Sequence, residues 1–168
     1  ALTQLGYTVQ RTSFPNYDSP SSSLIKMYLN GEFGENANSV NAFAASAFYA
    51  VDRFATFQKQ WAQFYEEGGL LLCDRYTTSN MIHQGSKISD VEDRQEYLAW
   101  LIELEYERFC LPKPDSVIFL EVPPQISQRL RKQRQDLKRD LAKDIHESNL
   151  DYLQKTYEIA CQIAREEN

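Results

Sequence analysis

The chain has 168 residues, of which 42% are hydrophobic and 25% charged, and its formal net charge at pH 7 is −6. This length and balance predict one compact globular domain and exclude an intrinsically disordered chain. No apolar run approaches the roughly 20 residues of a membrane helix, and no signal segment opens the chain, so membrane insertion and secretion gain no support. The acidic balance disfavours a general nucleic-acid-binding protein.

The predicted elements alternate between strands and helices. In chain order they are a strand over Tyr7–Phe14, a helix over Leu24–Leu29, a long helix over Asn41–Glu67 that ends at Gly68-Gly69, a strand over Leu70–Cys73, a helix over Val91–Cys110, a strand over Val117–Leu120, and helix from Gln125 almost to the end with a break near Ala142–Ile145. Apolar strands separated by helices indicate a mostly parallel sheet with both faces covered. The pattern therefore predicts an α/β fold.

The cysteines and histidines indicate no metal centre. The three cysteines lack Cys-x-x-Cys spacing, and the only histidines, His83 and His146, are far apart in the sequence. Cys73 follows three leucines, which predicts a buried, reduced thiol. We therefore expect a cytoplasmic protein without a structural metal.

Polar and aromatic residues follow each predicted strand, in the segments Phe14–Tyr17, Asp74–Tyr76 and Glu121–Pro123. In open α/β sheets, ligands bind beyond the carboxyl ends of the strands. The short polar side chains of 77–80 could line a pocket there. The acid–base pair Asp74-Arg75 can alternatively form a salt bridge at the end of its strand.

The long predicted helix carries two features. Tyr49 and Arg53 are four residues apart and share one face, which suits a planar heterocycle with a carbonyl group, although a surface Tyr–Arg contact fits as well. Apolar residues from Phe43 to Phe64 recur every three or four positions. That stripe predicts core packing, and its length leaves room for a dimer interface.

A basic run occupies residues 129–144. It holds seven lysines and arginines against three aspartates, a net charge of +4, so the rest of the chain carries −10. Such a run is either a solvated helix face or a clamp for a polyanion such as the phosphates of a nucleotide.

In order and spacing, these segments resemble the thymidylate kinase family. The matching stretches are Arg11–Tyr17, Phe48–Arg53, Asp74–Asn80, Leu111–Asp115 and Lys143–Glu147. The resemblance implies a single domain over residues 1–168 with the P-loop nucleoside-monophosphate-kinase fold, a three-layer sandwich around a parallel sheet, and a lid over residues 125–143. It also implies phosphorylation of dTMP to dTDP by ATP with Mg²⁺, as part of dTTP synthesis, in a cytoplasmic homodimer.

The resemblance implies a role for each matching site residue. Tyr49 would stack on thymine, Arg53 would reach a base carbonyl, and Arg75 would hold the dTMP phosphate. The implied substrate site comprises Phe14, Pro15, Tyr17, Tyr49, Arg53, Arg75, Ser79, Asn80 and His83, and His83 departs from the family pattern. The implied ATP-binding lid residues are Arg131, Arg134, Lys138, Arg139 and Lys143. Catalytic roles fall on Asp74, Arg75, Arg134 and Arg139, and Glu147 would act indirectly on magnesium.

One departure from the family is large. The phosphate loop that ends in Gly-Lys-Ser/Thr has no counterpart in these residues, and Ala1–Gly6 resembles the last turn of the helix that follows it. We therefore expect that the family's first strand and its final strand and helix are missing, with the first strand's place between Leu70–Cys73 and Val117–Leu120. A non-catalytic nucleotide-binding or dimer-forming remnant stays open as an alternative, as does another deoxynucleotide or deoxynucleoside kinase.

Overall fold

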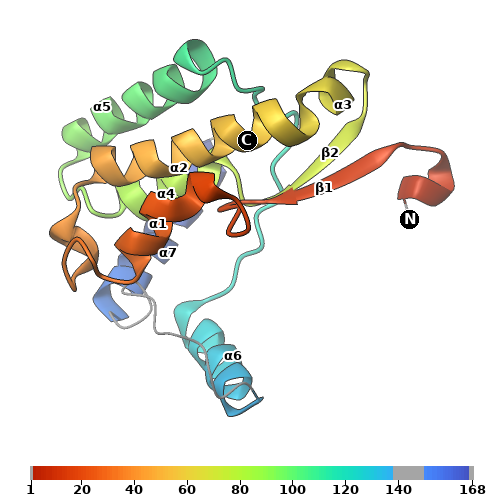
Figure 1. Ribbon diagram of the computed structural model, residues 1–168. Coiled ribbons are helices and arrows are strands. Elements are labelled where there is room, and N and C mark those ends of the chain that lie inside the picture. Colours follow the sequence, from red (N-terminus) through yellow and green to blue (C-terminus); the bar gives the residue numbers. More distant parts are fainter. Residues whose placement is uncertain (1, 138–149, 167–168) are drawn as a thin grey trace.

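The computed structural model describes residues 2–137 and 150–166 (Figure 1). The α-helices are α1 (Ser23–Leu29), α2 (Ala42–Thr56), α3 (Ala62–Glu66), α4 (Thr77–Gly85), α5 (Val91–Ile102), α6 (Pro124–Leu137) and α7 (Leu150–Glu166), and the strands are β1 (Val9–Ser13) and β2 (Leu70–Asp74). Short 3-10 turns occur at Leu2–Leu5, Pro20–Ser22 and Ala37–Ser39, and π-helical turns at Phe57–Trp61 and Glu103–Arg108. The predicted α/β class is confirmed.

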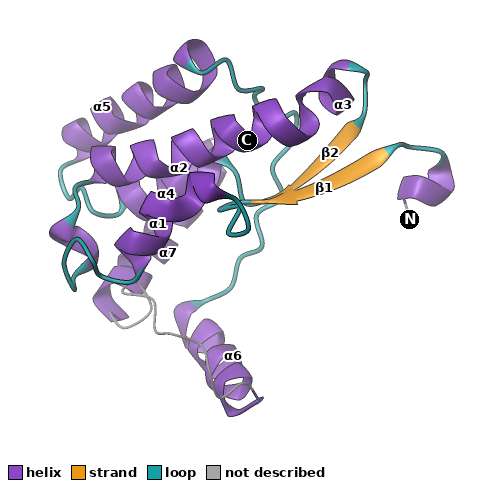
Figure 2. Ribbon diagram, in the orientation of Figure 1, coloured by secondary structure: helices purple, strands orange, loops and turns teal. Residues whose placement is uncertain are grey.

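The two strands form a parallel pair in the register Val9↔Leu70 to Ser13↔Asp74. Both strands therefore end at the same level, which brings the segments that follow them together. Figure 2 shows the pair to one side of a larger helical body. The chain crosses from β1 to β2 through α1, α2 and α3, as parallel neighbours require.

The strand predicted over Val117–Leu120 is wrong. A strand needs the N–H and C=O groups of a neighbour, and within the described residues the sheet contains only β1 and β2. The segment is an exposed loop, and Ile118 is 86% exposed. The prediction of a buried Cys73 is also wrong, because this thiol near the end of β2 is exposed. Within the described residues β2 pairs only with β1, so no further strand covers it.

The helix predicted over residues 41–67 is confirmed as one continuous run through α2, the π-helical turn and α3. The Asn41 side chain caps its start by accepting a hydrogen bond from the Ala44 N–H at 2.8 Å. Gly68 ends it with a positive φ of 83°, which glycine adopts without steric cost.

Two apolar clusters hold the body together. The helical cluster joins α2, α4, α5 and α7 through Ala42, Met81, Tyr97, Leu101 and Ile163. The second cluster fixes the end of β1 against the π-helical turn of the long helix, through Phe14, Phe57, Trp61 and Leu111. Figure 1 shows α6 standing away from this body. No helix in the described ranges is long and apolar enough to cross a bilayer.

Candidate functional site

The segments after the two strands lie side by side. The Phe14 N–H donates to the Asp74 carbonyl at 3.0 Å, which continues the strand pairing by one residue. The rings of Phe14 and Tyr76 lie 5.8 Å apart. Tyr76 donates its hydroxyl hydrogen to the Pro112 carbonyl at 3.0 Å, and burial raises the pKa of this phenol, which keeps it neutral. Aromatic packing between Phe14 and Tyr76 therefore fixes the two segments that follow the strands relative to each other.

Asp74 and Arg75 are exposed at the mouth of this site. Within the described part of the chain neither takes part in an ion pair, so the alternative of a salt bridge at the strand end is not realised. Arg75 has a φ of 65°, a left-handed conformation that costs a non-glycine residue about 1 kcal/mol or more. Strained residues of this kind concentrate at ligand sites.

Asp52, which the sequence analysis did not single out, fastens the loop after β1 to α2. This carboxylate is 1% exposed. Its Oδ2 accepts the Asn16 N–H at 2.8 Å, and its Oδ1 accepts the Ser21 hydroxyl at 2.5 Å. Pro15 and Tyr17 lie on this loop, so Asp52 sets their distance from α2. The signal for Asp52 in the sequence was a carboxylate on the long helix that follows Ala50 and Val51 and precedes Phe54 by two residues.

Arg53 is not the surface residue that one alternative suggested. It is 2% exposed and paired with Glu105, which is fully buried. Its Nε donates to Glu105 Oε2 at 2.6 Å, its Nη2 donates to Oε1, and the Thr77 hydroxyl donates to Oε2 at 2.8 Å. Sequence reasoning missed Glu105. The available signal was its spacing of four from Leu101, a core-facing position.

Asn80 on α4 faces α2. Asn80 is 4% exposed, and its Nδ2 donates to the Ser46 carbonyl at 3.2 Å. Its Oδ1 is buried and has no hydrogen-bond partner within the described residues, which is unusual for a buried acceptor. Along α2, Ser46, Tyr49 and Arg53 follow at steps of three and four. Helical spacing therefore places Tyr49 on the same face of α2 as Ser46 and Arg53.

Ser79 and His83 complete the α4 part of the site. The Ser79 N–H donates to the Tyr76 carbonyl at 3.1 Å in the first turn of the helix. His83 lies one turn after Asn80, and its carbonyl accepts the Tyr152 hydroxyl of α7 at 2.9 Å. The structure thus places the other predicted substrate-site residues after β1 and β2 and on α2 and the first half of α4, whereas His83 lies in the last turn of α4, against α7.

A family model for thymidylate kinase matches residues 1–168. The chain belongs to the thymidylate kinase family. It is 25% identical over 167 residues to the thymidylate kinase of Mycobacterium tuberculosis, covering 98% of this chain and 75% of the relative. It is 28% identical over 167 residues to a probable thymidylate kinase of Caldivirga maquilingensis, covering 99% and 71%. The thymidylate kinase of Herpetosiphon aurantiacus is 30% identical over 141 residues, covering 82% and 54%.

This membership confirms the predicted family and its P-loop nucleoside-monophosphate-kinase fold. Thymidylate kinases are nucleotide kinases that phosphorylate dTMP, and they generally use ATP with Mg²⁺. No group of three potential metal-ligating side chains occurs among the described residues. Mg²⁺ is typically held by one or two carboxylates together with substrate phosphates, and Asp74 is an exposed carboxylate at a strand end.

The segment predicted to form a lid, residues 125–143, is described in part. Arg131 and Arg134 lie on α6. The other predicted lid cations, Lys138, Arg139 and Lys143, lie outside the described residues, as does Glu147.

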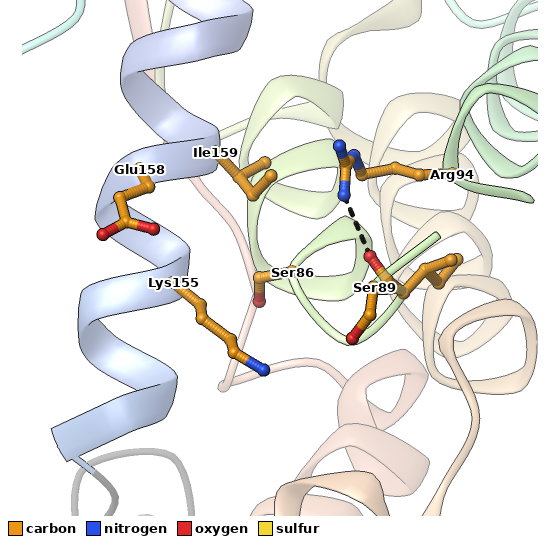
Figure 3. A pocket seen from close by; sticks show the side chains of 7 residues that line it. Ser86, Ser89, Arg94, Lys155, Glu158 and Ile159 are labelled. Carbon is orange, nitrogen blue, oxygen red and sulfur yellow. Dashed lines mark hydrogen bonds between the residues drawn. The ribbon is translucent and has the colours of Figure 1, made fainter. Parts of the chain in front are cut away.

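A separate hollow of about 240 Å³ lies at the far end of α4 (Figure 3). Arg94 of α5 and Lys155 of α7 flank it, and Arg94 donates to the Ile88 carbonyl at 3.0 Å. None of the residues predicted for the substrate site lines this hollow. The candidate site is therefore the region around the strand ends, at the opposite end of α4.

Proposed function

We propose that residues 1–168 supply the acceptor site and the lid of an enzyme that transfers the γ-phosphoryl group of ATP to dTMP, giving dTDP and ADP. One observation carries this proposal: two buried polar groups meet at the α2–α4 interface, Arg53 and the Asn80 Oδ1, which has no hydrogen-bond partner among the described residues. Helical spacing places Tyr49 on the same face of α2 as Arg53. Thymine offers the matching chemistry, because it has a carbonyl acceptor, an N–H donor and a flat ring. Arg53 donates to the carbonyl, Asn80 accepts the N–H, and Tyr49 stacks on the ring.

The exposed ends of the strands would hold the phosphate. Arg75 extends from the end of β2 with no competing ion pair among the described residues, so it can bind the dTMP phosphate and orient the attacking oxygen. Pro15 and Tyr17 close over the nucleotide from the loop that Asp52 fastens. The Phe14 ring and the Ser79 N–H both contact Tyr76, so they help to fix the segment that follows β2.

Catalysis would then consist of positioning and charge neutralisation. Mg²⁺, when bound, would neutralise charge on the phosphates of ATP. Asp74 would lie beside those phosphates, and Glu147 would act on the metal indirectly. Arg134 and Arg139 would place positive charge near the transferring phosphoryl group, and Arg131, Lys138 and Lys143 would hold ATP under the closed lid.

A coupled assay for ADP tests the proposal with the natural protein, ATP, Mg²⁺ and each of dTMP, dCMP, dGMP and dAMP. We expect turnover with dTMP at least about tenfold above that with the other acceptors, which corresponds to about 1.4 kcal/mol of discrimination. Arg75→Ala should lower kcat/KM for dTMP by about 100-fold. Turnover with a different nucleotide, or with deoxynucleosides, would refute the assignment of dTMP.

A nucleotide-binding protein without kinase activity is the second candidate. These 168 residues contain no Gly-x-x-x-x-Gly-Lys motif. The backbone N–H groups and the lysine of that motif hold the β- and γ-phosphates of ATP in P-loop enzymes. Calorimetry that detects dTMP binding to a natural protein without turnover would favour this candidate.

We also infer a homodimer in a reducing compartment. Exposed apolar side chains on α2, including Val51 and Phe54, form a face that a second copy can cover. The three cysteines are free thiols, which supports a cytoplasmic location. Light scattering at micromolar concentration should give twice the mass of one chain, and a monomer would contradict the dimer.

A further inference from the structure

Glu105 is a carboxylate buried where three helical elements meet. It lies in the π-helical turn after α5 and is fully buried. Its two oxygens accept three hydrogen bonds, two from Arg53 of α2 and one from Thr77 at the start of α4. A carboxylate in such a place is tolerated only when its charge is paired and its lone pairs are used. The pairing with Arg53 is therefore obligatory for both side chains.

The geometry of this pair fixes the orientation of the Arg53 guanidinium. Two parallel N–H···O bonds to one carboxylate hold the guanidinium plane, which a single bond would leave free to rotate. Nε and one N–H of Nη2 bond to Glu105, so both N–H groups of Nη1 and the second of Nη2 are left for a ligand. The direction in which Arg53 can donate is thus set by Glu105 on another element.

We propose that Glu105 is a positioning residue that aims Nη1 of Arg53 at a carbonyl of the pyrimidine base, and so sets the preference for thymine over a base with an amino group at that position. This inference rests on the proposed function, because it takes Arg53 to contact the base. Thr77 extends the effect, since it ties the start of α4, just after Arg75, to the same carboxylate. The distance between Arg53, which would contact the base, and Arg75, which would contact the phosphate, is thereby fixed.

A purely structural role makes a different prediction. If Glu105 only stabilises the fold, its replacement weakens the binding of every ligand alike, in proportion to the loss of folded protein. If it orients Arg53, its replacement weakens the binding of the thymine nucleotide selectively. A cytosine nucleotide presents an amino group at that position, so its binding gains nothing from the oriented N–H donor of Arg53. The ratio of the two affinities separates these roles.

The experiment measures the Kd of dTMP and of dCMP by calorimetry, with the natural protein at a temperature well below its melting transition. Glu105→Gln has the same size but lacks the charge and one acceptor. We expect it to raise the Kd of dTMP about tenfold and to change that of dCMP by less than about twofold. Glu105→Asp keeps the charge but is shorter, and should lower the selectivity less. Glu103→Gln is the matched control, because Glu103 is exposed and pairs with Arg108 outside the site.

Each outcome decides the inference. A selectivity ratio unchanged in both Glu105 variants, while Arg53→Met loses selectivity, overturns the positioning role and leaves the proposed function standing. A natural protein without preference for dTMP over dCMP, and unaffected by Arg53→Met, refutes the proposed function and this inference together. Loss of selectivity in Glu105→Gln and Arg53→Met, but not in Glu103→Gln, supports the inference.

Discussion

Removing the Asp52 carboxylate should destabilise the protein and loosen the loop that carries Pro15 and Tyr17. Asp52 is 1% exposed and accepts hydrogen bonds from the Asn16 N–H and the Ser21 hydroxyl. Hydrogen bonds to a charged group contribute about 1.5–3 kcal/mol each, and the two share one acceptor group, so their losses will not add fully. We therefore expect Asp52→Ala to lower the free energy of unfolding by about 2–4 kcal/mol.

Urea unfolding of the natural protein, followed by circular dichroism, measures this loss. Asp52→Asn should cost less than half as much, because the amide oxygen can still accept the Asn16 N–H and the Ser21 hydroxyl can turn to accept a hydrogen. Asp115→Ala is the control, since Asp115 is exposed and its removal should change stability by no more than about 0.5 kcal/mol. Equal stability of Asp52→Ala and the control would refute the claim that Asp52 fastens the loop.

Three further predictions concern base binding, the half-buried Lys87, whose Nζ donates to the Tyr28 hydroxyl and the Val40 carbonyl, and phosphoryl transfer. Arg53→Ala should weaken dTMP binding by about 1.5–3 kcal/mol in calorimetry, and unchanged affinity would contradict its contact with the base. Burial lowers the pKa of Lys87 to about 8. Because the folded state binds this proton less tightly than the unfolded state, the free energy of unfolding should rise from pH 8 to pH 9.5. Urea titrations measure this rise, and Lys87→Met should abolish it. A polypeptide limited to residues 1–168 should show no dTMP kinase activity in a coupled assay, whereas an added strand, glycine-rich loop and helix should restore it, and steady ADP production by the shorter chain would contradict this.

Periodicity and turn residues were enough to predict much of the fold. The apolar stripe of the long helix, Asn41 at its start and Gly68 at its end are local signals, and they act in the structure as the sequence implies. The convergence of Phe14–Tyr17 and Asp74–Tyr76 also followed from the sequence, because parallel strands end at one edge of the sheet.

The errors concern groups whose state depends on a partner distant in the sequence. Val117–Leu120 has the composition of a strand, but the described residues offer it no neighbouring strand. Spacing placed Arg53 beside Tyr49 on α2, yet its burial depends on Glu105, which is 52 residues away. Helix α4 went unpredicted because its short polar residues favour helix ends and turns as much as helices, and its packing against α2 decides the outcome.

A crystal structure of the natural protein with bound dTMP tests the central claim most directly. We predict that the thymine ring stacks on Tyr49, that a base carbonyl lies within hydrogen-bond distance of Arg53 Nη1, and that the phosphate contacts Arg75. A nucleotide bound in the hollow beside Arg94 and Lys155, or a base beyond the reach of Arg53 and Asn80, would contradict the account.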